Sequence, residues 1–228
     1  MNFAELEKKL GVKFKNHDLL IRALTHRSFL NEAHRPKPES NERLEFLGDA
    51  VLSFVISKLL YQQFPHHQEG NLTNIRSNLV KTLTLSKIGK ELTIGDYLFL
   101  SRGEAESGGQ QNLALIANAV EALIGAIFLD QGIAVVEDFI RRFFSGTLEA
   151  IIKTGNFKDS KNILQEKIQK RDIRPPTYKI LGQAGPDHNK TFTVGVFVKN
   201  KLLAKGVGKN KLEAEKEAAR TVLESLSK

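Results

Sequence analysis

The chain of 228 residues has no cysteine. This absence excludes thiolate catalysis, disulfide bonds and cysteine-based zinc sites, and it is compatible with a reducing compartment. The N-terminus carries no basic-then-apolar leader, and we find no uninterrupted apolar run long enough to cross a bilayer. We therefore expect a cytoplasmic protein that makes no contact with a membrane.

The net charge of +8 is unevenly distributed along the chain. Residues 1–157 hold 18 Lys and Arg against 18 Asp and Glu, whereas residues 158–228 hold 16 against 8. A neutral larger part joined to a basic smaller part suggests a catalytic body with an attached polyanion-binding domain. The alternative, a basic segment that only aids solubility, is weaker because this region also has the pattern of a folded unit.

Hydrophobic periodicity predicts a helical first domain over residues 1–155. Apolar residues recur at helical spacing there, and no useful stretch alternates with period two. Gly103 and Ser107–Gly109 predict a flexible loop. The predicted helices cover residues 3–11, 17–29, 42–64, 71–92, 113–128 and 135–152.

The pattern changes in residues 158–228, which predict a second domain of the order α-β-β-β-α. A helix reaching Gln169 is followed by Pro175 and Pro176, and strands are predicted to begin at Thr177 and to cover residues 191–198 and 202–207. Asn210 caps the last helix, with Glu213 at the spacing of a capping box. The predicted fold class is therefore multidomain, α followed by α+β.

Two predicted helices of the first domain carry polar groups on one face. Glu45 and Asp49 stand one turn apart, and Asn118 and Glu121 are the only polar side chains between Leu113 and Leu129. A carboxylate in such an apolar helix is costly unless a cation or hydrogen bonds compensate it. The alternative is a solvated acidic face with one satisfied polar group, but two such segments favour a divalent-cation site.

Several blocks of sequence resemble the ribonuclease III family. Its nine-residue signature has a close match in ERLEFLGDA at residues 42–50. Other matching blocks occur in the expected order: LTHRS at 24–28, FP at 64–65, EG at 69–70 and VEALIGA at 120–126. Residues 158–227 look like the family's double-stranded RNA-binding domain, with LQE at 164–166, PTY at 176–178, GPDH at 185–188 and EAE at 213–215.

The resemblance implies a Mg²⁺-dependent endoribonuclease for double-stranded RNA, with Mn²⁺ able to substitute and no nucleotide or organic cofactor. Its expected products carry 5′ phosphates, 3′ hydroxyls and two-nucleotide 3′ overhangs, and its expected substrates include ribosomal RNA precursors and some messenger and transfer RNA transcripts. The residues that match the family's catalytic positions are Asp49, Glu121, Glu45, Glu42 and Glu69, of which Glu69 is expected to act through water or on the RNA. The metal ligands would be Glu45, Asn118, Glu121 and Asp49.

Asn118 departs from the family, which normally has aspartate at this position. An amide oxygen can still bind Mg²⁺, but the site loses one negative charge. Both a natural variant with a weaker metal site and a substitution introduced to trap a complex fit this change. Two alternatives to a full nuclease follow: a family member that binds duplex RNA but cuts it weakly or not at all, and a structural protein that uses the helical domain only to dimerise.

The resemblance also assigns a dimer contact and three RNA-binding surfaces. Phe46 matches the residue that fills a cavity in the partner subunit, so we expect a homodimer, although a lone Phe is more often a core residue. On the second domain the RNA-binding residues would be Gln165, Glu166, His188, Lys209 and Lys211. These should read duplex shape rather than sequence. Without the surrounding motif, His188 would be an ordinary loop histidine.

Overall fold

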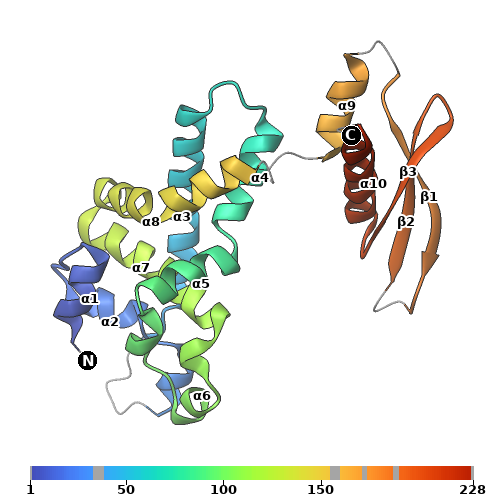
Figure 1. The fold of residues 1–228 in the computed structure, drawn as a ribbon. Helices are drawn as coiled ribbons and strands as arrows, with labels where there is room; N and C mark the ends of the chain where they lie inside the picture. The colour runs from blue at the N-terminus through green and yellow to red at the C-terminus, as the bar shows by residue number, and fades with distance from the viewer. Residues whose placement is uncertain (1, 33–38, 155–159, 171–173, 187–189, 227–228) are drawn as a thin grey trace. The chain divides into compact units, whose positions relative to one another are not determined.

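The computed structural model describes residues 2–32, 39–154, 160–170, 174–186 and 190–226. It divides into two compact units, residues 1–155 and 156–228. The first is helical, and the second is a three-stranded sheet with two helices (Figure 1). The predicted fold class is confirmed.

The first unit contains long helices joined by short helical turns. Its helices are α1 (Phe3–Leu10), α2 (His17–Ala23), α3 (Glu42–Gln63), α4 (Glu69–Leu79), α5 (Thr82–Glu91), α6 (Arg102–Glu106), α7 (Leu113–Gln131) and α8 (Ile133–Thr154). The described residues of this unit also form three 3₁₀ helices, η1 (Arg27–Asn31), η2 (Ile94–Tyr97) and η3 (Gly109–Gln111).

Two predicted helices are broken in the structure. The helix predicted over 17–29 ends at Ala23, because the next residues pair with a distant segment: Phe99 N–H donates to Leu24 C=O at 2.9 Å, and His26 N–H donates to Phe99 C=O at 3.0 Å. The helix predicted over 71–92 splits into α4 and α5, because Lys81 adopts an extended conformation. The loop predicted at 103–109 contains α6 and η3.

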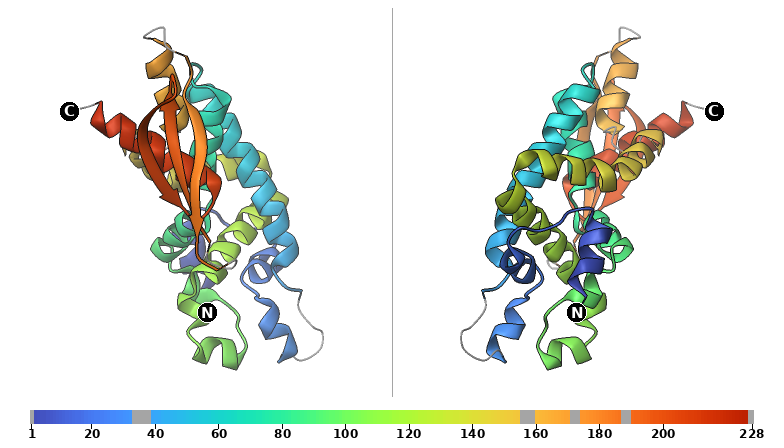
Figure 2. Two further views of the ribbon diagram at one scale, coloured as in Figure 1. Left: turned by 90° about the vertical axis from the view of Figure 1, so that its right-hand side faces the viewer. Right: turned by 90° about the vertical axis from the view of Figure 1, so that its left-hand side faces the viewer.

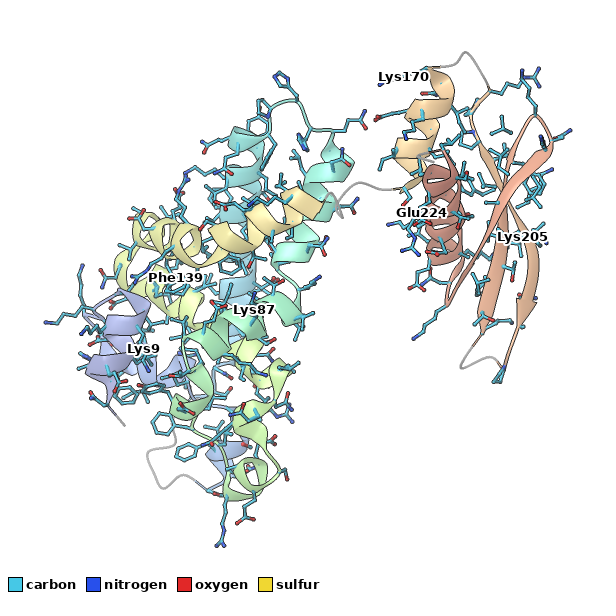
Figure 3. The ribbon with its side chains drawn as sticks, viewed as in Figure 1. Lys9, Lys87, Phe139, Lys170, Lys205 and Glu224 are labelled. Carbon is cyan, nitrogen blue, oxygen red and sulfur yellow. The ribbon has the colours of Figure 1, made fainter. Side chains whose placement is uncertain are left out.

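Helix α7 forms the centre of the first unit, packed against α3, α5, α2 and α8 (Figures 1 and 2). Its N-terminus is capped by the Asn112 side chain, which accepts from Ala114 N–H at 2.9 Å. The core around it also includes Phe139 of α8, which is 3% exposed (Figure 3). Gly89 of α5 lies so close to α7 that an added Cβ would meet Ile116 at 2.3 Å.

Helix α7 combines an apolar composition with burial in the first unit. Within the described residues, α7 is long and apolar enough, by length and composition, to cross a bilayer. However, ten of its residues are buried in the first unit, as expected for the core helix of a globular domain.

The second unit stacks two helices on one face of an antiparallel sheet (Figure 1). Its elements are α9 (Ser160–Gln169), β1 (Thr177–Ala184), β2 (Thr191–Val198), β3 (Lys201–Gly208) and α10 (Lys211–Ser225), with strand order β1-β2-β3. Leu164, Val196 and Val222 belong to the buried core between the layers. The predicted cap is present: the Asn210 side chain accepts from Glu213 N–H at 2.9 Å, and the Glu213 carboxylate accepts from Lys209 N–H at 3.0 Å.

Candidate active site

An acidic cleft lies along the contact between α3 and α7. Its volume is about 470 Å³. Four of the five predicted catalytic residues and all four predicted metal ligands line it. The lining residues are His26, Arg27, Asn41, Glu42, Glu45, Phe46, Asp49, Asn118 and Glu121.

The walls of this cleft are α3 and α7, and a glycine on each helix lets the two backbones come close together. A Cβ added to Gly48 of α3 would lie 1.8 Å from the Glu121 C=O, and one added to Gly125 of α7 would lie 2.3 Å from the Leu44 C=O. The helices therefore touch backbone to backbone where each carries its polar residues. This contact brings Glu45 and Asp49 beside Glu121, which the spacing within each helix could not establish.

The carboxylates of the cleft repel one another. Burial, with the charges of Asp49 and Glu45, raises the pKa of Glu121 to about 7. Burial and the charges of Glu42 and Asp49 also raise the pKa of Glu45, while a hydrogen bond from the Asn118 side chain opposes this rise. Such a site favours either protons or a cation.

The donor set of the cleft fits a hard divalent cation. Glu45, Asp49 and Glu121 supply carboxylate oxygens and Asn118 an amide oxygen, which are ligands that Mg²⁺ binds. Among the described residues, no three Asp, Glu or His side chains are yet arranged around one metal position. Like charges disfavour such convergence, and a bound cation would neutralise them.

Two other predicted catalytic residues, Glu42 and Glu69, are placed differently from the half-buried Glu45 and Glu121. Glu42 is exposed at the edge of the cleft, where its carboxylate accepts from Ser40 at 3.1 Å and lies 3.5 Å from Arg27. Glu69 does not line the acidic cleft. It begins α4, accepts from the Thr73 hydroxyl at 3.0 Å, and lines a separate cavity.

The separate cavity lies beside an exposed apolar stripe on α3. Phe46, Phe54 and Tyr61 are 81%, 58% and 76% exposed, and their spacing of about two turns places them on one face. The cavity has a volume of about 410 Å³, and its lining includes Phe54, Tyr61 and Leu72. An apolar stripe of this kind marks an interaction surface.

Three cleft-lining residues received no role from the sequence: His26, Arg27 and Asn41. His26 and Arg27 belong to the block at residues 24–28 that resembles the ribonuclease III family. That resemblance was the sequence signal that could have pointed to a role in the site. Asn41 precedes α3, and its backbone N–H donates to Thr25 C=O at 2.8 Å. This bond joins the segment of residues 24–28 to the start of α3.

The second unit exposes most of its predicted RNA-binding residues. Gln165 and Glu166 are exposed on α9, and Lys209 and Lys211 are exposed at the N-terminus of α10. His188 lies outside the described residues. Lys170 and Lys205 add exposed positive charge to this basic unit (Figure 3).

The two units match two known domain families. Residues 16–148 match the ribonuclease-III-like family, and residues 160–226 match the double-stranded RNA binding motif. Fold and matches together define an endoribonuclease with a double-stranded RNA-binding domain. The chain belongs to the ribonuclease III family.

Relatives extend over nearly the whole chain. It is 44% identical to ribonuclease 3 of Carboxydothermus hydrogenoformans, over 99% of this chain and 96% of that protein. It is 40% identical to ribonuclease 3 of Borreliella afzelii, over 98% and 91%. Among solved structures, the nuclease domain of ribonuclease III from Campylobacter jejuni is 38% identical with a TM-score of 0.59, over 64% of this chain and 95% of that one. Another structure of that domain is described in terms of a region involved in dimer formation.

Proposed function

We propose that the protein hydrolyses phosphodiester bonds of double-stranded RNA in a Mg²⁺-dependent reaction, with Mn²⁺ as a substitute. The observation that supports this most directly is the half-buried Glu121, held against Asp49 and Glu45 by the contact of α3 with α7. An enclosed acidic group of this kind costs stability unless a cation compensates it. A purely structural role for the helical unit does not explain this cost.

The cleft residues would bind the cation, and the bound cation would assist the chemistry. Glu121, Glu45 and Asp49, with the amide oxygen of Asn118, would hold the cation. When bound, Mg²⁺ would lower the pKa of water and stabilise the charge that develops on the attacking and leaving oxygens. The oxygen of this water would attack phosphorus, and the bond between phosphorus and the 3′ oxygen would break. The products would then carry the proposed 5′-phosphate and 3′-hydroxyl ends.

We further propose a homodimer in which Phe46 of each protomer enters the cavity beside α4 of its partner. The cavity offers apolar walls to an aromatic ring that is exposed in the protomer. Glu69 lines this cavity, whereas Phe46 lines the acidic cleft. The docking would therefore bring Glu69 of one protomer near the acidic cleft of the other, which accounts for its separation within a single chain. Two clefts on one duplex would give the two-nucleotide overhangs.

The second unit supports recognition of duplex RNA by shape. Gln165 and Glu166 would meet one minor groove, while Lys209 and Lys211 would contact phosphates beside the N-terminus of α10. As biological substrates we propose ribosomal RNA precursors and some messenger and transfer RNA transcripts, processed in the cytoplasm.

A cleavage assay tests the proposal. The full chain is incubated with a long RNA duplex and Mg²⁺, Mn²⁺ or EDTA, and the ends of any products are mapped. We expect cutting with either cation, none with EDTA, and none by Glu121→Ala. Cutting in EDTA, or full activity of Glu121→Ala, would refute the metal-dependent mechanism.

The specific observation that favours a second function is Asn118, which leaves the cleft one charge short of the family pattern. In this case the protein holds duplex RNA and cuts it slowly. Tight duplex binding without products in Mg²⁺, combined with cutting by Asn118→Asp, would establish this function.

A further inference from the structure

The segment from Thr25 to Ser28 borders the acidic cleft and has no role in the function proposed above. His26 and Arg27 of this segment line the cleft together with four carboxylates. Among the cleft-lining residues that the structure describes, Arg27 alone carries a permanent positive charge. An RNA strand that enters must place anionic phosphates in an acidic cleft, so a fixed cation at its edge has a clear electrostatic use.

Hydrogen bonds hold this segment firmly in place. His26 N–H donates to Phe99 C=O at 3.0 Å, and the Ser28 hydroxyl accepts from Ser101 N–H at 3.0 Å. Thr25 C=O accepts from Asn41 N–H at 2.8 Å, which fixes the segment to the first residues of α3. The backbone that carries His26 and Arg27 therefore loses little further entropy when a ligand binds.

The hydrogen bonds of the His26 ring define its tautomer. Nδ1 accepts from Ser28 N–H at 3.3 Å and lies 2.9 Å from the Ser28 hydroxyl. A nitrogen that accepts an N–H bond carries no proton, so the neutral ring is protonated on Nε2. In the described part of the chain this Nε2–H makes no hydrogen bond, and it is therefore available as a donor in the cleft.

Arg27 is held only loosely. Its side chain is 72% exposed, and its described partner is Glu42, at 3.5 Å and 56% exposed. An ion pair between two such exposed groups contributes little to stability. Arg27 can therefore exchange this carboxylate for a phosphate, to which guanidinium offers two parallel N–H donors.

We propose that His26 and Arg27 form a phosphate-binding arm that holds the backbone of the RNA strand in the acidic cleft. His26 donates through Nε2–H, and Arg27 supplies charge and a bidentate contact. The inference rests on the proposed function, because it concerns the same cleft and the same substrate. It adds two substrate-contacting residues to the lining of the cleft.

Three substitutions separate this role from a structural one. Arg27→Gln removes the charge, and Arg27→Lys keeps the charge but not the paired donors. His26→Asn keeps a side-chain acceptor for Ser28 N–H but removes Nε2. The matched control is Arg102→Gln, since Arg102 is 85% exposed on α6 and paired with Glu106, and it does not line the cleft.

Cleavage and binding are then measured independently. We expect Arg27→Gln and His26→Asn each to lower kcat/KM about tenfold or more, Arg27→Lys to recover part of the loss, and Arg102→Gln to match the unmodified protein. Binding of an intact duplex is measured in a Glu121→Gln background with Mg²⁺. In this background Arg27→Gln should make the fall of log affinity with log salt concentration less steep by somewhat less than one unit. A change of this size corresponds to the loss of one phosphate contact.

Unchanged kcat/KM and an unchanged salt slope for Arg27→Gln and His26→Asn would overturn the arm. Equal losses for Arg102→Gln would also overturn it, since the effect would then be one of overall charge. If the unmodified protein cut no duplex in either cation, the proposed function would fail, but the salt slope would still test the contact between Arg27 and phosphate.

Discussion

Asn118 places a neutral amide next to the carboxylates Glu45 and Glu121 in the cleft. It lowers the pKa of Glu45, whereas an ionised aspartate at this position would raise it. The amide therefore relieves repulsion in the absence of a cation, at the cost of a negative charge that would help to bind one.

Asn118→Asp should lower the Mg²⁺ concentration needed for half-maximal cleavage, or raise the cleavage rate, because the added charge strengthens cation binding. The measurement is a Mg²⁺ titration of duplex cleavage for both forms. Identical rates at every Mg²⁺ concentration would contradict the assignment of Asn118 to the metal site.

The raised pKa of Glu121 should make stability depend on pH in a metal-free buffer. Between its ordinary pKa and about 7, the folded state binds more protons at Glu121 than the unfolded state, so stability falls as pH rises through this window. Glu121→Gln should therefore stabilise the protein at about pH 8 by roughly 1–2 kcal/mol, allowing for solvent screening, and have little effect at about pH 4. Urea unfolding of the two proteins in EDTA, at each of these pH values, measures the difference in stability.

Asp130 provides a control of the opposite sign. Burial alone would raise its pKa, but hydrogen bonds from Lys15 and Asn16 N–H, at 2.8 and 2.9 Å, lower it. Asp130→Asn should destabilise the protein at about pH 8, where the carboxylate bonds are present. A stabilising effect of both substitutions at that pH would count against the pKa assignments.

At the scale of the elements, the contact between α3 and α7 sets the geometry of the cleft. Gly48→Ala would place a Cβ 1.8 Å from a main-chain oxygen that cannot rotate away. We expect a loss of about 3 kcal/mol or more, larger than most overpacking substitutions, together with weaker Mg²⁺ binding as the walls separate. Denaturant unfolding and calorimetric titration with Mg²⁺ would measure the two effects.

Gly146 supplies the matched control within another helix. It lies in α8, where an added Cβ meets nothing within 4 Å. Gly146→Ala should stabilise the protein by roughly 0.5–1 kcal/mol through helix propensity. If Gly48→Ala behaved like Gly146→Ala, the close approach of the helices would not be required.

Most elements could be predicted from local pattern. The strand over 191–198 follows from alternation, and the cap at Asn210 follows from its capping-box spacing to Glu213. The end of α2 could not be predicted in this way, because it depends on backbone pairing with Phe99, more than seventy positions away. The break between α4 and α5 lies inside a periodic apolar pattern, which gave no reason for Lys81 to be extended.

The site shows the same division. Helical spacing predicts that Glu45 shares a face with Asp49 and Asn118 with Glu121, but only the glycine contact joins the two pairs. His26 and Arg27 reach the cleft through backbone pairing that leaves no periodic signal. Glu69 matched a family position, yet within one chain it lies in another cavity.

At the scale of the whole molecule, Phe46→Ala should weaken the proposed dimer. The ring is 81% exposed in the protomer, so its removal should leave protomer stability nearly unchanged. If each ring contributes about 2 kcal/mol on burial, loss of both copies would raise the dimer Kd about a thousandfold. Sedimentation velocity over a dilution series measures this change.

Leu83→Ala is the control for the dimer, since Leu83 is 63% exposed on α5 and does not belong to the stripe on α3. It should leave the dissociation constant unchanged. A monomeric unmodified protein, or equal effects of the two substitutions, would contradict the proposed docking of Phe46.

The division into a neutral helical unit and a basic sheet unit also determines how substrate is supplied. Because one polypeptide carries both, a duplex captured by the second unit experiences the cleft at an effective concentration that can reach the millimolar range. Tethering of this kind lets the cleft itself bind RNA weakly and release cut ends quickly. Turnover then depends on capture, which salt can tune without altering the chemistry.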